Sequence, residues 1–138
     1  MAVTSAFVNQ AKLDMLDGVH AAADVYKVAL YTQAAATWDK TSTTYSTTGE
    51  LATANGYTQG GQTLVNRSAA LSGDVAYVDW DDPAWAASSI TADAAVIYNS
   101  SKSNKIVSVY AFTTATSTNA TWTLQLPAPG ATASIRIS

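Results

Sequence analysis

One histidine, His20, and no cysteine limit the acid–base and metal chemistry that this chain could perform. A general base needs a partner within hydrogen-bond reach, and a zinc site usually needs several imidazole or thiolate ligands. His20 falls between a predicted helix and the first predicted strand, where we expect a solvated or capping side chain. Composition alone leaves a Ser-His-Asp triad open, but no G-x-S-x-G motif presents a nucleophilic serine. We predict that the protein is not an enzyme and has no cofactor.

Carboxylates cluster around the segment Asp79-Trp80-Asp81-Asp82-Pro83. Oxygen ligands on such a turn could bind calcium, but the D-x-D-x-D-G loop and its distal glutamate are absent. A turn at the end of a strand, with solvated carboxylates, is the favoured interpretation, and we predict no metal site. On paper, Glu50 could form a glycosidase pair with one of these aspartates. No motif in the sequence supports that pairing.

Four tryptophans and seven tyrosines offer another kind of chemistry, because aromatic rings can stack on sugars. Aromatic residues at alternating strand positions more often lie in a core or an interface, and we predict this for Trp80, Trp85 and Trp122. Trp38 is the exception, since it lies in a polar stretch with no predicted strand face to bury it. The glycines of residues 56–61 follow neither the dinucleotide-binding nor the phosphate-loop pattern, and they predict tight turns.

Charge and length restrict the class of protein further. Only 12% of the residues are charged and the net charge is −3, so the attraction that dominates nucleic-acid binding is missing. We predict no direct nucleic-acid partner. Residues 1–18 lack the pattern of a signal peptide and no stretch is long enough to span a bilayer, so we expect a soluble protein, made in a cytoplasm, without membrane association. The 138 residues are the usual size of one domain, and we expect a single domain over 1–138.

The elements that would position these residues begin with one short N-terminal helix over residues 5–17. Its apolar side chains recur every three to four positions, with Thr4 or Ser5 as the cap and Gly18 as the stop signal. The apolar stripe consists of Val8, Ala11, Met15 and Leu16. About three turns of helix are marginally stable alone, so this helix must pack on the body or on a partner.

From residue 25 onward the period is two, which predicts an all-β body over 25–138. Residues 33–48 are polar and without a period, and we interpret them as a long loop with a short edge strand near Tyr45. We predict about eight short antiparallel strands in a jelly roll or β-sandwich, whose strand order the alternation leaves open. The predicted strands are 26–31, 62–70, 75–80, a weaker 85–90, 94–98, 106–112, 121–126 and 134–138.

Several blocks of sequence occur in a characteristic order along residues 24–112. They are KVALYT (27–32), YSTTGE (45–50), GYTQGGQTL (56–64), DWDDPAW (79–85), SITA (89–92) and AAVIYN (94–99). With this series the chain resembles small virion proteins of tailed phages that serve as capsid decoration or cement proteins. The likeness extends to the jelly-roll cement proteins of short-tailed Bordetella phages.

The resemblance implies a β-sandwich or jelly roll on the capsid exterior of the virion, bound to the phage major capsid protein and stabilising the head. It also implies self-pairing, with a homodimer favoured over a trimer, and it carries over no catalytic residues. We expect the helix and the 33–48 loop to act as docking arms. The residues predicted to contact the capsid or a second copy are Phe7, Val8, Met15, Trp38 and Tyr45.

Two other functions are compatible with the same sequence. A tail, head–tail connector or receptor-binding virion protein could use the same kind of sandwich. A carbohydrate-binding module or a small glycosidase could use the aromatic side chains. The number of copies per particle separates a shell protein from a tail protein, and a glycan array tests the second alternative.

Overall fold

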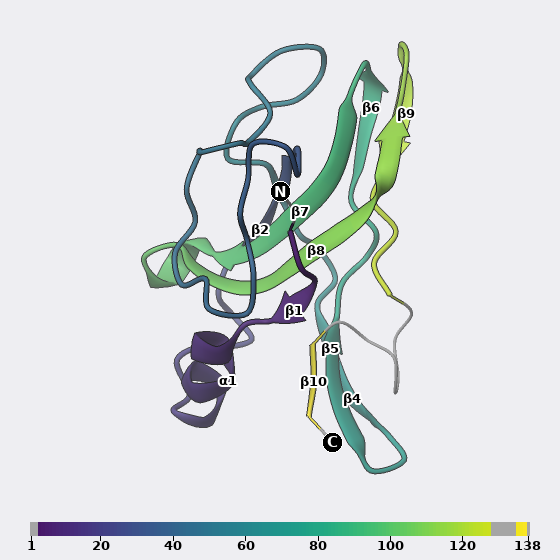
Figure 1. Ribbon diagram of the computed structural model, residues 1–138. Helices are drawn as coiled ribbons and strands as arrows, with labels where there is room; N and C mark the ends of the chain where they lie inside the picture. Colours follow the sequence, from purple (N-terminus) through teal and green to yellow (C-terminus); the bar gives the residue numbers. More distant parts are fainter. Residues whose placement is uncertain (1–2, 128–134, 138) are drawn as a thin grey trace.

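Ten antiparallel strands and one short α-helix make up the part of the chain that this computed structural model describes, residues 3–127 and 135–137. The elements are β1 (Ala6–Phe7), α1 (Asn9–Leu16), β2 (Tyr26–Tyr31), β3 (Gln62–Thr63), β4 (Ser68–Ser72), β5 (Val75–Asp79), β6 (Ala84–Ser88), β7 (Thr91–Asn99), the 3₁₀ turn η1 (Ser100–Lys102), β8 (Lys105–Thr116), β9 (Ala120–Thr123) and β10 (Ile135–Ile137). They form a five-stranded sheet β1-β8-β7-β2-β3, a three-stranded sheet β10-β5-β4 and a two-stranded ladder β6-β9 (Figure 1). The predicted all-β class is confirmed, and the arrangement is consistent with a β-sandwich.

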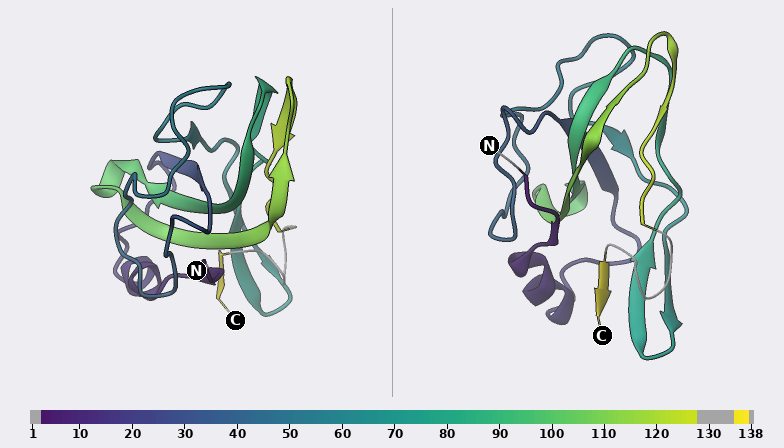
Figure 2. Two further views of the ribbon diagram at one scale, coloured as in Figure 1. Left: turned by 45° about the horizontal axis from the view of Figure 1, so that its top comes forward. Right: turned by 45° about the vertical axis from the view of Figure 1, so that its right-hand side comes forward.

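β7 and β8 are the two longest strands and form a curved ribbon that the other elements extend (Figures 1 and 2). Their pairing shifts register between Ala92 and Ala94 and again between Ile97 and Tyr98. Such irregularities bend and twist a ribbon locally. At the open end of the hairpin, the Ser117 amide donates to the Ile90 carbonyl at 2.8 Å, and the chain continues from there into the β6-β9 ladder.

The core lies on both faces of the central strand β2. Tyr26 packs against Trp80 with 5.3 Å between ring centroids, and Tyr31 packs edge-on against Trp38 at 5.4 Å. Successive side chains of a strand point to opposite faces, so these two contacts cover β2 from both sides. This explains why residues 28–31 are all fully buried, although a single strand at the surface would expose one of its faces to solvent.

The helix is shorter than predicted and begins differently. Ala6 and Phe7, predicted to be helical, instead pair with Ser108 and Val109 of β8. The N-cap is Val8 and makes no side-chain hydrogen bond, so the prediction of a Thr4 or Ser5 cap was wrong. The Ser5 hydroxyl cannot cap the helix because it is bonded elsewhere. It accepts a hydrogen bond from the Ala111 amide and donates one to the Ala111 carbonyl.

The predicted strand over 62–70 is two strands, β3 and β4. Asn66 lies between them with φ of 55°, a left-handed conformation that interrupts a ladder. The weak strand predicted over 85–90 is β6, which ends in a bulge where Ala87 has φ of 49°. The break at 66 and the unpredicted β1 account for ten strands where about eight were expected.

Candidate functional site

The carboxylate of Glu50 is the centre of a cluster of tyrosines. Its Oε2 accepts from the Tyr45 hydroxyl at 2.5 Å, and its Oε1 accepts from the Tyr57 hydroxyl at 2.6 Å and from the Gly60 amide at 2.7 Å. The Tyr57 hydroxyl in turn accepts from the Leu30 amide of β2 at 3.0 Å. The cluster therefore fastens the segment 45–60 to the central sheet.

Tyr98 of β7 completes this cluster. Its ring stacks on Tyr45 with 4.3 Å between centroids, and its hydroxyl donates to the Gly60 carbonyl at 2.5 Å. Burial, and then the nearby Glu50 charge, raise the pKa of Tyr98 to about 12. The tyrosines are thus neutral donors at physiological pH, and the carboxylate that they surround is fully engaged.

Asp79 is the last residue of β5, and Asp81 and Asp82 follow the strand, as predicted for a strand end. Asp81 and Asp82 make structural hydrogen bonds. Asp81 accepts from the Asn66 side chain at 2.5 Å, and Asp82 accepts from the Leu126 amide at 2.8 Å. Burial, with a smaller contribution from the two neighbouring aspartates, raises the pKa of Asp79. The hydrogen bonds of Glu50 run to Tyr45, Tyr57 and Gly60, and no described hydrogen bond joins it to an aspartate of the acidic turn. Among the described residues, no three His, Asp or Glu side chains gather in a way that could hold a metal ion.

His20 is buried, with 7% of its surface exposed, so the expectation of a solvated side chain was wrong. The side chain of Asn99 determines which ring nitrogen of His20 carries the proton. The Asn99 Oδ1 accepts from the Ser101 amide, so its amide nitrogen is the atom that faces His20 Nδ1 at 3.0 Å and Asp24 at 2.8 Å. His20 Nδ1 must then accept, which places the proton of the neutral ring on Nε2, 3.7 Å from the buried Asp14 Oδ2.

This arrangement predicts acid sensitivity. Burial lowers the pKa of His20, and the attraction of Asp14 offsets this only in part. A histidine whose folded-state pKa lies below its unfolded value of about 6.5 gives its full stabilisation above that value and loses it as the pH falls through the folded pKa. We expect the free energy of unfolding to decline below about pH 6.5, with a slope of at most ~1.4 kcal/mol per pH unit for one proton. Urea unfolding between pH 5 and 8 measures it.

The matched control is His20→Gln, which keeps an acceptor for Asn99 and cannot titrate. It should remove the decline that His20 causes, since the chain has no other histidine. The Asn99 hydrogen bond lowers the pKa of Asp24 to about 2, so the contribution of Asp24 is lost only below about pH 4. A decline in His20→Gln as steep as that of wild type would contradict the assignment.

Three of the four tryptophans are in the core, as predicted. Trp85 and Trp122 meet edge-on at 5.7 Å, and the Trp122 Nε1 donates to the Ala115 carbonyl at 3.1 Å. Trp80 is buried against Tyr26. Trp38 is half-buried on Tyr31, which corrects the expectation that nothing would bury it. Trp80, Trp85 and Trp122 are each at most 6% exposed, which leaves little indole surface for stacking on a sugar.

The five predicted contact residues are less available than expected. Val8 is fully buried, and Trp38 and Tyr45 pack into the body. The 33–48 loop is correctly predicted as a loop, but the edge strand near Tyr45 is a single bridge between Thr44 and Lys105. Backbone hydrogen bonds, among them Tyr45 N–H to Asn104 O at 2.9 Å and Ile106 N–H to Thr43 O at 2.9 Å, hold the loop on the sheet. It is part of the fold and not a free arm.

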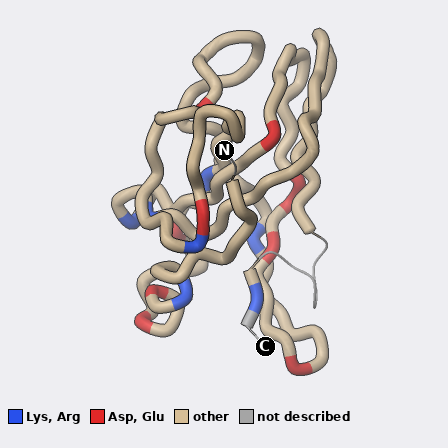
Figure 3. Tube along the Cα trace, viewed as in Figure 1, with Lys and Arg blue, Asp and Glu red and all other residues tan. Residues whose placement is uncertain are grey.

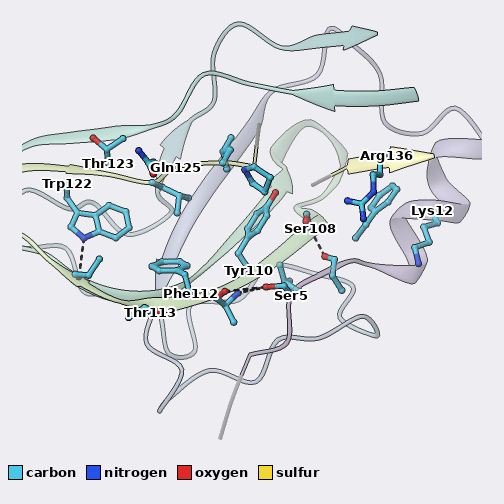
Figure 4. A pocket seen from close by; sticks show the side chains of 18 residues that line it. Ser5, Lys12, Ser108, Tyr110, Phe112, Thr113, Trp122, Thr123, Gln125 and Arg136 are labelled. Atoms are coloured by element: carbon cyan, nitrogen blue, oxygen red, sulfur yellow. Dashed lines mark hydrogen bonds between the residues drawn. The ribbon is translucent and has the colours of Figure 1, made fainter. Parts of the chain in front are cut away.

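Phe7 and Met15 do border open surface. An open groove of about 980 Å³ runs between β1 and β8 on one side and β9 with the segment after it on the other. Figure 4 shows Tyr110, Phe112 and Trp122 along it, with Lys12 and Arg136 toward one end. Among the described residues that line this groove there is no carboxylate, although the chain as a whole is acidic. A smaller apolar hollow of about 310 Å³ lies between Phe7, Met15 and the β4–β5 hairpin.

Sequence reasoning missed the groove. The alternation of Ser108, Tyr110 and Phe112 along β8 was a usable signal, because these side chains share one face of a strand. Lys12 and Arg136 come from opposite ends of the chain, so no local pattern could bring them together. No helix in the described chain is long and apolar enough to cross a membrane.

Comparison with protein-family models, with curated proteins and with solved structures finds no match for this chain.

Proposed function

We propose that this chain is a non-catalytic virion structural protein of the capsid decoration type, which binds the outside of the major capsid protein lattice and stabilises the phage head. The order of sequence blocks described above motivates the choice of family. The observation that carries a docking role is the open groove of about 980 Å³ beside β8. Glu50 and His20, which could have suggested chemistry, are engaged in internal hydrogen bonds.

The groove favours an extended segment of a partner protein. The groove is long enough to accept several residues of a peptide. Its lining combines aromatic and polar side chains, and most binding sites likewise have an apolar lining with a few precisely placed polar groups. Lys12 is an exposed cation at one end of the lining, so the partner segment should carry negative charge at that end. Contacts repeated over a symmetric lattice would strengthen a modest single affinity.

The test uses heads that lack the protein. Purified chain should bind them and raise their resistance to heating, and Lys12→Glu should weaken binding several-fold at low salt, with a smaller effect at high salt. Lys40→Glu is the matched control, because Lys40 is also exposed but does not line the groove. Sedimentation of heads with bound protein gives both affinities. Wild-type chain that binds no heads, or heads equally stable without it, would refute the proposal.

Copy number separates this proposal from a tail, connector or receptor-binding role. Several hundred copies per particle would place the protein on the shell, and a dozen or fewer would place it at a vertex or tail. A sugar-binding role is disfavoured because Trp80, Trp85 and Trp122 have little exposed surface. A glycan array with wild type and Trp38→Ala tests it directly.

A further inference from the structure

β4 is an edge strand that no other described strand covers. It is the outermost strand of the sheet β10-β5-β4, and all five of its residues, Ser68–Ser72, are exposed. Its Leu71 side chain is 74% exposed. The β4–β5 hairpin extends away from the rest of the body, and the strand itself carries no charge (Figures 1 and 3). Proteins usually protect such edges with lysine, proline, a bulge or a covering segment, because an open edge pairs with other strands.

The hairpin geometry determines which backbone groups of β4 point outward. Ser72 pairs with Val75 across the two-residue loop Gly73-Asp74, where Gly73 has φ of 59°. Residues that flank a loop of this length exchange both backbone hydrogen bonds, and the pattern then alternates along the ladder. Ser72, Ala70 and Ser68 therefore bond to β5. The N–H and C=O groups of Ala69 and Leu71 face away from β5, and no described residue bonds to them.

We propose that β4 pairs with β4 of a second copy of this chain, antiparallel and centred on Ala70. In this register Ala69 lies opposite Leu71 of the second copy, so the outward groups of both residues are satisfied by four backbone hydrogen bonds around a two-fold axis. It is also the only register in which all five residues of both strands overlap. The two three-stranded sheets become one continuous sheet of six strands.

Charge near β4 is compatible with the antiparallel pairing. The strand itself has no charged residue, and the guanidinium of Arg67, which precedes it, lies over the Tyr26 ring at 6.0 Å from the centroid. Asp74 follows the strand at the tip of the hairpin. Antiparallel pairing centred on Ala70 keeps the two Asp74 carboxylates at opposite ends of the pair, whereas an in-register parallel pairing would bring them together.

The contact is small, which determines the expected affinity. Pairing two five-residue strands buries well under the roughly 1,200–2,000 Å² of a typical stable interface. We therefore expect a weak, concentration-dependent dimer in solution. On any surface that holds two copies side by side, the second contact is effectively intramolecular and strengthens the assembly.

Cysteine cross-linking tests the register, because the wild-type chain contains no cysteine. In the proposed register, Ala70 lies opposite Ala70 of the second copy as a non-hydrogen-bonded pair. The Cα atoms of such a pair are about 4.5 Å apart, which is within the range that a disulfide can span. Ala70→Cys, oxidised by copper–phenanthroline at high protein concentration, should form a covalent dimer. Ala69→Cys and Leu71→Cys alone should cross-link at least tenfold more slowly, whereas a mixture of the two should form the mixed dimer.

Ala76→Cys, exposed on the neighbouring strand β5, is the control for random collision. Cross-linking of Ala70→Cys no faster than that of Ala76→Cys overturns the proposal, and fastest self-cross-linking at position 69 or 71 overturns the register. Sedimentation equilibrium is an independent measurement. Wild type should dimerise with rising concentration and Ala70→Asp, which places two carboxylates face to face, should stay monomeric with an unchanged circular dichroism spectrum. All these measurements use the isolated chain, so they stand whether or not the protein binds phage heads.

Discussion

Replacing Glu50 by alanine is expected to destabilise the fold by about 3 kcal/mol, since it removes a half-buried acceptor that serves three donors. Hydrogen bonds to a charged group each contribute roughly 1.5–3 kcal/mol, and a buried donor left without a partner costs about 1–3 kcal/mol. The hydroxyls of Tyr45 and Tyr57 and the amide of Gly60 would all lose their acceptor. Glu50→Ala should therefore lower the free energy of unfolding by more than the loss of a surface carboxylate would.

Urea unfolding followed by tryptophan fluorescence measures this loss. Tyr45→Phe removes one of the three donors and keeps the ring stacked on Tyr98, so it should cost only about 1 kcal/mol. Glu50→Gln keeps one acceptor oxygen and should fall between the two. A Glu50→Ala variant within 0.5 kcal/mol of wild type would show that the cluster contributes little, as ~0.5 kcal/mol is the usual effect of a surface substitution.

The loss should also appear locally. The Glu50 cluster and the backbone hydrogen bonds of residues 43–45 are what hold the long connection between β2 and β3 against the sheet. In Glu50→Ala, limited proteolysis should therefore cut within 45–60 before it cuts the β7–β8 ribbon. Low local stability is expected wherever a segment has few buried contacts of its own.

The strands with the clearest period were predictable from the sequence. Residues 26–31 were predicted as they are found, and β7 and β8 were located correctly but longer than expected. Their apolar runs reflect burial, which is a local and strong signal. The hairpin turn at Gly73 was also predictable, because glycine there adopts a positive φ.

The predictions that were wrong concern residues whose environment is set by partners far away in the sequence. Ser5 has the side chain of a helix cap, yet its hydroxyl bonds to Ala111 across the molecule. His20 was expected in solvent because its partner Asn99 lies 79 residues away in sequence. Trp38 has polar neighbours in the sequence, yet its ring packs on Tyr31 and is half-buried. In each case a tertiary contact overrides a sound local preference, and a single sequence contains no record of such contacts.

Gly61→Ala is expected to be the most damaging single-atom change outside the core, costing more than about 3 kcal/mol. A β-carbon at Gly61 would lie 1.9 Å from the Val28 carbonyl oxygen and 2.8 Å from the Ala29 Cα. Both are backbone atoms of the central strand β2, so no side-chain rotation can relieve the overlap. Relief requires β3 to move away from β2, which breaks the pairing of Gln62 with Val28.

Gly18→Ala separates the steric overlap from the backbone conformation. Gly18 has φ of 73° against 80° for Gly61, but a β-carbon there meets nothing within 4 Å. It should therefore cost only the ~1–2 kcal/mol of a left-handed non-glycine residue. Thermal unfolding of both variants compares them, and equal losses would mean that β3 moves aside without penalty. A clear excess for Gly61→Ala would show that close backbone contact at this glycine fixes the β2–β3 pairing, and with it the position of Gly60 and the Glu50 cluster.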